Sequence, residues 1–133
     1  MRNASLDTRE RIAARKWVQE AIRFYESAGA DALLAEMEKP DGRFAVGDRC
    51  VFALDTHGTM LAHPLERDLK GKVLTGLKDS DGKAFIQKII DITNGRGYGF
   101  IEYRWPHPES GKEMGKTVFF EKVDRIIFCS GFY

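Results

Sequence analysis

Residues 49–64 read RCVFALDTHGTMLAHP, and this stretch predicts a β-hairpin. Its first arm, Cys50 to Leu54, is apolar at every position, as expected for a strand that is covered on both faces. Asp55 to Gly58 is typical of a turn, because Asp bonds its own backbone and Gly accepts positive φ. Thr59 to His63 is the return arm, which Pro64 ends because proline has no N–H for a strand ladder. Upstream of this hairpin the patterns favour helix, and downstream they favour mostly strand.

A long helix is predicted upstream, over residues 7–28. Asp7 and Glu10 have the spacing of a capping box, and Gly29 suits the position after the last helical residue. Its apolar residues form one wide stripe at helical spacing: Ala14, Val18, Ala21, Ile22 and Tyr25, flanked by Trp17, Phe24 and Ala28. Core packing is the expected use of this stripe, and pairing with a second helix is the alternative.

The remaining elements are shorter. Asp31 is expected to cap a second helix that runs to Met37. After a long connection from Leu65 to Ser80, Asp81 opens a third helix, which carries Phe85, Ile86, Ile89 and Ile90. Three strands follow, over 98–105, 117–122 and 125–133. This order predicts an α+β fold: one five-stranded antiparallel sheet with helices packed mainly on one face.

Composition limits the class of protein. The chain has 133 residues, enough for one domain with one core. Its 21 basic and 20 acidic residues give a net charge of +1, which argues against a nucleic-acid partner. No apolar run approaches the ~18 residues of a membrane span, and no leader pattern is visible, so we expect no membrane insertion and, for the chain as written, a cytoplasmic location.

Motifs for catalysis or cofactor binding are missing from the sequence. We find no zinc-binding histidine pair, no nucleophile elbow and no phosphate-binding loop, so neither an enzyme nor a metal or cofactor site is predicted. Cys50 and Cys129 have no metal-site spacing. They are either two free thiols or a disulfide between the first and last strands, which would need an oxidising compartment.

Several short motifs carry a resemblance to a known family. They are Asp55-x-x-Gly58-x-x-Leu61-Ala62-His63-Pro64, Gly71-Lys72-x-Leu74, Lys78-Asp79-x-Asp81-Gly82-Lys83-x-Phe85-Ile86, Tyr103-x-Trp105-Pro106-x-Pro108 and Ile126-Ile127-x-Cys129-Ser130-Gly131-x-Tyr133. In this order and spacing they resemble the single Cache sensor domain of bacterial chemoreceptors, sensor kinases and small stand-alone proteins. The resemblance runs from about Trp17 to the C-terminus.

The resemblance implies a PAS-like five-stranded antiparallel sheet behind a long N-terminal helix. Residues 1–133 would then be one domain, with the helix at about 7–28 and the sensor core at about 30–133. It also implies a pocket between the sheet and the segments that cross it, a small ligand that is often a carboxylate, and a place outside the cytoplasmic membrane. A role in signal transduction or chemotaxis follows from the same resemblance.

Arg104 and Trp105 are the first candidates for binding such a ligand. A guanidinium offers two parallel donors to a carboxylate, and an aromatic wall excludes water. Neighbours on a strand point to opposite faces, so Trp105 can share the pocket with Tyr103 only if Arg104 faces away, unless a bulge re-aims it. The alternative is that Trp105 belongs to the core and Arg104 to the surface.

Six further residues complete the candidate pocket. By the resemblance Lys116 is a pocket cation for a small anion, whereas the alternative is a solvated lysine on an edge strand. His63 could donate to an acid at the pocket rim, or bind backbone as a structural histidine. Phe44 and Phe119 could close the pocket, as could Phe52 and Phe120, or all four could be core aromatics.

The leading hypothesis is a non-catalytic sensor domain that binds a small organic acid or a similar polar metabolite. Binding would order the loop 65–80 and shift the N-terminal helix, within the limit set by the ligand's different affinity for the two states. The second hypothesis is a structural or dimerisation module of the same fold, which forms a homodimer through the N-terminal helix.

Overall fold

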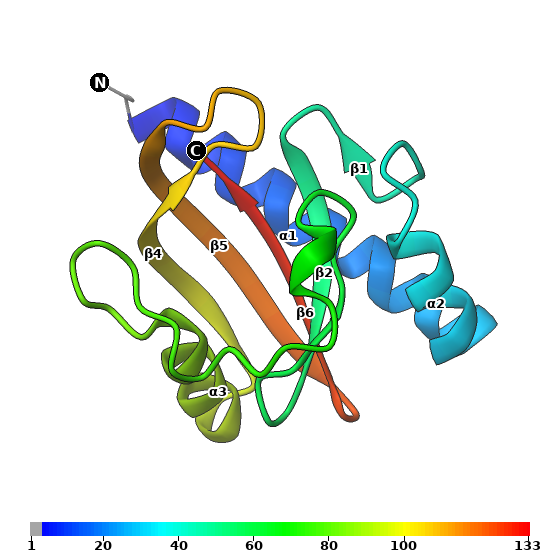
Figure 1. Cartoon of the computed structure of the whole chain (residues 1–133). Helices are drawn as coiled ribbons and strands as arrows, with labels where there is room; N and C mark the ends of the chain where they lie inside the picture. The colour runs from blue at the N-terminus through cyan, green and yellow to red at the C-terminus, as the bar shows by residue number, and fades with distance from the viewer. Residues whose placement is uncertain (1–3) are drawn as a thin grey trace.

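The computed structural model describes residues 4–133, and one antiparallel sheet lies at its centre (Figure 1). The strands are β1 (Ala45–Val46), β2 (Arg49–Asp55), β3 (Met60–Ala62), β4 (Tyr98–Pro106), β5 (Glu113–Val123) and β6 (Ile126–Phe132). They lie in the order β1-β2-β6-β5-β4, and β3 pairs with β2 outside this order. The predicted fold class is confirmed. The short strand β1 was not predicted.

The predicted hairpin is formed by β2 and β3, which pair antiparallel. Five consecutive residues of β2, Cys50 to Leu54, are buried, as the continuous apolar run indicated. The Asp55 carboxylate accepts the backbone N–H of His57 and of Thr59, both at 2.9 Å. Gly58 adopts a φ of 85°, which a residue with a side chain would adopt only under strain. The turn chemistry therefore determines where β2 reverses.

The helices are α1 (Ala4–Ala28), α2 (Ala30–Met37) and α3 (Phe85–Gly95), with a 3₁₀ turn at Arg67–Leu69. Gly29 alone separates α1 from α2, with a φ of 89° and its N–H on the carbonyl of Tyr25. Its predicted role as the residue that follows the first helix is confirmed.

The three predicted helix caps are wrong. Asp7 lies inside α1, where its carboxylate binds Arg11 at 2.8 Å. Asp31 lies in the first turn of α2, because Gly29 is already at the capping position. Asp81 lies in a turn and not at a helix start, because α3 begins only at Phe85, with Ala84 at the capping position.

Two faces of the sheet are covered, which corrects the expectation of helices mainly on one face (Figure 1). On the α1 face, residues such as Val51, Phe119 and Phe128 pack against α1 and α2. On the α3 face, residues such as Phe52 and Phe120 pack against α3 and the segment 65–84. A strand presents alternate residues to opposite faces, so a central strand with apolar residues in series needs two covers.

The segment 65–84 crosses the α3 face as an ordered strap. Three main-chain hydrogen bonds join it to the hairpin. The N–H of Gly71 donates to the carbonyl of Met60, the N–H of Met60 to the carbonyl of Lys72, and the N–H of Leu74 to the carbonyl of Gly58. It brings Leu65, Leu69, Leu74 and Leu77 against the core of this face. We refer to residues 65–84 as the strap.

None of the helices within residues 4–133 combines the length and the apolar character that a membrane crossing needs.

Candidate functional site

A narrow cavity, partly open to solvent, lies between the α3 face and the strap, with about 20 Å³ of room for the centre of a water-sized sphere. Its walls come from β2, β3, β4, β5, the strap and the first turn of α3. Most of the lining is apolar, with five residues that carry polar groups: His63, Glu66, Tyr103, Trp105 and Lys116. An apolar pocket with a few polar groups is the usual form of a small-molecule site.

Lys116 brings a cation into this cavity. It lies on β5 opposite Tyr103 of β4, in the interior of the sheet, and it is only 7% exposed. Within residues 4–133 its ammonium has no hydrogen bond and no ion pair, and its Nζ lies 5.3 to 5.8 Å from the ring centres of Phe52, Tyr103 and Tyr133. Burial lowers the pKa of Lys116. The alternative of a solvated edge-strand lysine is therefore wrong.

Gly131 makes room for this lysine. It lies on β6 beside β5, where a Cβ atom would come within 2.8 Å of Cε of Lys116. A side chain at this position would displace the lysine or the strand. The cavity's cation thus depends on a glycine of the neighbouring strand.

His63 follows β3 and faces the cavity as a neutral side chain. Its Nδ1 accepts the backbone N–H of Leu65 at 3.1 Å and of Glu66 at 2.9 Å. Burial, and to a lesser extent the nearby Lys116, lowers the pKa of His63 to about 3. A neutral imidazole that accepts at Nδ1 carries its proton on Nε2. In the described part of the chain this N–H has no hydrogen-bond acceptor, so His63 has both a structural bond and an unused donor.

Tyr103 and Trp105 form an aromatic wall on β4. Tyr103 stacks on Phe85 at 3.9 Å between ring centres, and Trp105 meets Phe85 edge to face at 5.5 Å. Burial raises the pKa of Tyr103 well above its usual value, so its hydroxyl keeps its proton. This hydroxyl has no hydrogen bond to any described residue. The indole N–H of Trp105 donates to Glu66 at 3.3 Å.

Together these residues place three unused donors around one cavity: the ammonium of Lys116, the Nε2–H of His63 and the hydroxyl of Tyr103. None of these three atoms is among the fully shielded ones without a partner, so water or a ligand can supply their acceptors. A carboxylate has two acceptor oxygens and one negative charge, which matches one cation and two neutral donors.

Three of the predicted pocket residues lie elsewhere. Arg104 points away from the cavity, as strand alternation without a bulge requires, and pairs on the surface with Glu113 at 3.4 Å. Phe44 and Phe119 lie on the α1 face, where Phe44 packs against Phe24 and Phe119 against Phe100. The expectation that these two close the pocket is wrong. Phe52 lines the cavity instead, and Phe120 lies in the core of the α3 face.

Other cavity residues were missed because they lie in the strap or in α3. Glu66, Leu69, Leu74 and Leu77 come from the predicted connection, and Phe85 and Ile86 from the third helix. The regularly recurring leucines of the connection were the available signal, since a solvated loop has no need of them.

Cys50 and Cys129 are free and buried on the α3 face. Cys129 pairs with Phe52, so Cys50 is its diagonal neighbour across β2 and β6. Diagonal positions are about 7–8 Å apart, whereas a disulfide needs Cβ atoms at about 3.5–4.5 Å. Burial raises the pKa of Cys50 to about 12. The structure thus has two inert thiols rather than the alternative disulfide.

Metal binding finds no support in the described residues 4–133, where no three His, Cys, Asp or Glu side chains are grouped to hold an ion.

Comparison with known protein families matches residues 40–127 to the family described as Cache domain. Among curated proteins, the methyl-accepting chemotaxis protein McpP of Pseudomonas putida is 27% identical over 62 residues, which is 47% of this chain. The chain spans only about a tenth, 11%, of that relative's length.

Two solved structures share the fold over nearly their full length. One, titled as the structural basis for carboxylic acid recognition by a Cache chemosensory domain, has a TM-score of 0.82 at 23% identity, covering 100% of this chain and 99% of that one. The other, a periplasmic sensor domain of a chemotaxis protein, has a TM-score of 0.77 at 24% identity, covering 98% and 99%. At these identities the likeness establishes the fold.

Proposed function

This chain belongs to the Cache domain family, whose members are ligand-binding sensor modules, and on that premise we propose that it binds a small carboxylic acid without catalysis. The ligand's carboxylate would lie in the cavity between the α3 face and the strap, against Lys116. Its carbon chain would face Trp105 and the leucines of the strap.

The observation that carries this proposal is the unpaired ammonium of Lys116. Burial makes the charged form of this lysine costly, and the aromatic faces and the more distant Glu66 offset only part of that cost. An anionic ligand would supply the missing partner and restore an ordinary pKa to the lysine. His63 and Tyr103 support the same ligand, because both are neutral donors that can bind carboxylate oxygens without adding charge.

The size of the cavity favours a ligand of few carbon atoms. The room for the centre of a water-sized sphere is only about 20 Å³, little more than one water needs and far below the roughly 300–1,000 Å³ of drug-sized sites, so a ligand would have to be small and the strap would have to move to admit it. Carboxylic acid recognition by the related Cache chemosensory domain supports this class of ligand.

Signal output would pass through the sheet to α1. Two ion pairs join α1 to the strands, one between Glu10 and Arg49 and one between Arg11 and Glu102. A hydrogen bond from the Tyr25 hydroxyl to Asp124 joins α1 to the β5–β6 turn. A ligand that binds more tightly when the strands are in one of two positions would shift α1. The size of the shift is limited by the difference between the ligand's affinities for the two positions.

The alternative, dimerisation through α1, would have little apolar surface of the predicted stripe to use. Ala14, Val18 and Ala21 are fully buried against the sheet, and Trp17 and Phe24 are partly buried there. The sheet thus uses most of the stripe on which a second copy would have to pack.

A thermal-shift screen with short monocarboxylates, dicarboxylates, amino acids and amines tests the proposal. A ligand at about 100 times its dissociation constant adds roughly 2.7 kcal/mol to stability, a shift of several degrees. We expect carboxylates to stabilise the chain and Lys116→Met to abolish the shift. Lys112→Met, which removes an exposed lysine of the β4–β5 loop, is the matched control and should leave the shift unchanged. A thermal shift that survives in Lys116→Met would contradict the proposed site. Stabilisation by amines in place of carboxylates would contradict the proposed class of ligand.

A further inference from the structure

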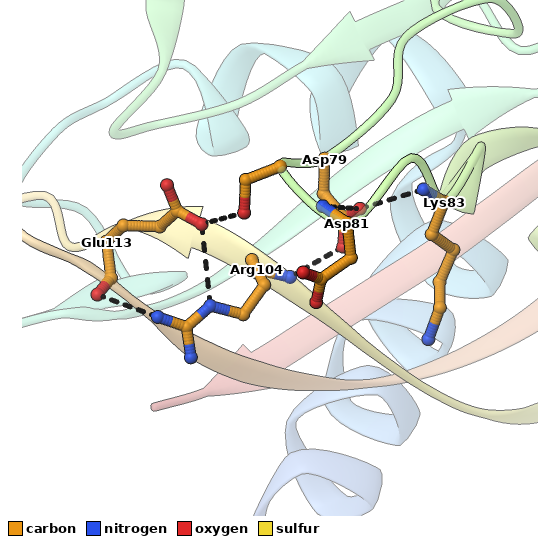
Figure 2. Close-up of polar contacts among 6 residues, drawn as sticks. Asp79, Asp81, Lys83, Arg104 and Glu113 are labelled. Carbon is orange, nitrogen blue, oxygen red and sulfur yellow. Dashed lines mark hydrogen bonds and ion pairs between the residues drawn. The ribbon is translucent and has the colours of Figure 1, made fainter.

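Asp79 is a nearly buried carboxylate outside the cavity that the proposed function leaves unused. It is 9% exposed and lies in the strap, shortly before α3 begins at Phe85. Its Oδ1 accepts the N–H of Asp81 at 3.0 Å and of Lys83 at 2.8 Å, and its Oδ2 accepts the N–H of Arg104 at 2.9 Å (Figure 2). Three main-chain donors therefore meet on one side chain.

The bond to Arg104 is the one that joins different parts of the molecule. β4 is the last strand of the sheet, so the N–H of Arg104 has no strand beside it to accept its hydrogen bond. The strap supplies that acceptor through Asp79 and a second contact through Lys83, whose ammonium donates to the carbonyl of Glu102. Ser80 adds a third, through its hydroxyl to Glu113. The turn 79–83 thus fastens the strap along the free edge of β4.

This attachment lies directly behind the aromatic wall of the cavity. Arg104 is flanked on β4 by Tyr103 and Trp105, whose side chains point to the other side and line the cavity. Phe85, which stacks on Tyr103, follows the turn by two residues. The position of the turn on β4 therefore sets how closely the strap and Phe85 approach the two aromatic residues.

We propose that Asp79 is a positioning residue of the pocket: without touching the ligand, its carboxylate holds the strap closed on β4 and so keeps the cavity formed. This inference deepens the proposed function and rests on it for the ligand, but closure of the strap can be measured without any ligand. Only the ionised carboxylate can accept all three N–H groups with its two oxygens. A neutral side chain of the same shape would lose the bond to Arg104 or part of the turn.

Protonation of Asp79 should therefore open the strap. The N–H of Arg104 is the largest of the influences that lower the pKa of Asp79, followed among the favourable ones by the N–H groups of Lys83 and Asp81. The charged groups that face the turn are Lys83 and Asp81 within it, Arg104 on β4 and Glu113 on β5. A carboxyl whose pKa is lowered in the closed state favours closure above its ordinary pKa, and this contribution is lost as the pH falls through the lowered value.

The test uses Trp105 as a reporter of closure. In a Trp17→Phe background Trp105 is the only tryptophan, and acrylamide quenching of its fluorescence measures its exposure to solvent. We expect Asp79→Asn to raise the quenching constant at least twofold at neutral pH, and to weaken binding of propionate at least tenfold if propionate binds the parent. Asp81→Asn makes the same chemical change two residues away on an exposed side chain, and should alter neither.

The pH profile separates positioning from a general loss of stability. Quenching of Trp105 should rise in the parent as the pH falls below the ordinary range of an aspartate, while the protein stays folded by circular dichroism. The same profile should be flat and high in Asp79→Asn. If Asp79→Asn does not fold, the parent's pH profile and amide exchange of Arg104 and Lys83 still decide the question.

Two results would overturn the inference: equal quenching in Asp79→Asn and Asp81→Asn, or a parent profile with no rise before global unfolding. Absence of carboxylate binding in the parent would instead count against the proposed function. The role of Asp79 in closing the strap would still be decided by the quenching of Trp105, which needs no ligand.

Discussion

The two faces of the sheet are built from the same strands and differ in what they leave unpaired. On the α1 face, side chains such as Phe119, Phe128 and Leu33 are fully buried and fill the space against α1 and α2. On the α3 face, the strap encloses a cavity whose walls hold an unpaired lysine and two neutral donors. One face supplies packing, and the other gives up some packing for a mostly apolar cavity with a few polar groups.

This difference assigns stability and binding to different layers of one small domain. Residues that are adjacent in β5, Phe119 and Phe120, belong to different faces, and so do neighbours along β2. A substitution on the α1 face should therefore change the free energy of unfolding, whereas one on the α3 face should also change binding or its pH dependence. The predictions below test that division.

The largest effect is expected from Phe119→Ala on the α1 face. Removing a fully buried aromatic ring costs about 3–5 kcal/mol, through lost transfer energy and the cavity that is left. Urea denaturation measures this loss, and carboxylate affinity of the folded fraction should stay unchanged. A loss of affinity together with little loss of stability would return Phe119 to the pocket and contradict the division.

The next effect concerns His63 and acid. Its pKa is lowered from 6.5 in the unfolded chain to about 3 in the fold, so the unfolded state binds the proton first. Above pH 6.5 His63 is neutral in both states and costs the fold no stability. Below pH 6.5 the free energy of unfolding falls by about 1.4 kcal/mol per pH unit, a loss of roughly 2.7 kcal/mol at about pH 4.5. Denaturation at several pH values measures this loss, and the His63→Gln variant should lack it. His57→Gln, on an exposed turn, is the control, and an unchanged slope in His63→Gln would refute the prediction.

A smaller effect of opposite sign is expected for Lys116→Met in the absence of ligand. Methionine fills similar space without a buried charge, so the variant should be as stable as the parent or up to about 2 kcal/mol more stable near neutral pH. The pKa of Lys116 is lowered in the fold, so the unfolded state keeps its proton longer and the parent gains stability as pH rises toward 10.5. The variant should lack this gain. Clear destabilisation by Lys116→Met would indicate a structural partner for the lysine.

The smallest effect is expected for Arg104→Ala. Among residues 4–133 this exposed side chain pairs only with Glu113, and surface ion pairs contribute about 0–1 kcal/mol. Its backbone N–H, which binds Asp79, is unaffected by the substitution. Calorimetric titration with a carboxylate should give the parent's affinity, and a loss of tenfold or more would place Arg104 in the site after all.

Much of the fold was predictable because it depends on short-range chemistry. The hairpin at 49–64 follows from an apolar run, an Asp–Gly turn and a proline, all within one short stretch. Alternation along β4 correctly separated Arg104 from Tyr103 and Trp105. The helix caps failed because a carboxylate near a predicted helix start has other partners available, as Asp7 shows by binding Arg11 inside α1.

The candidate site was only partly predictable. Lys116, His63, Tyr103 and Trp105 were named in advance and do line one cavity, and their roles in binding stay predictions. Phe44 and Phe119 were misplaced because the expected single covered face left no reason to separate aromatic residues by side. Glu66 and the strap leucines were missed, since only the folded strap brings a connection over the sheet.

The sequence by itself determined the fold class, the positions of the main helices and strands, and, along β4, which residues share a face. These depend on periodicity and turn chemistry, which act over a few residues. Only the tertiary structure decided which face holds the cavity, that Lys116 is buried without an anion, and that the carboxylate of Asp79 meets the backbone of β4. Burial and long-range hydrogen bonds arise from segments far apart in the chain, so the charge state of a side chain is known only once its neighbours are in place.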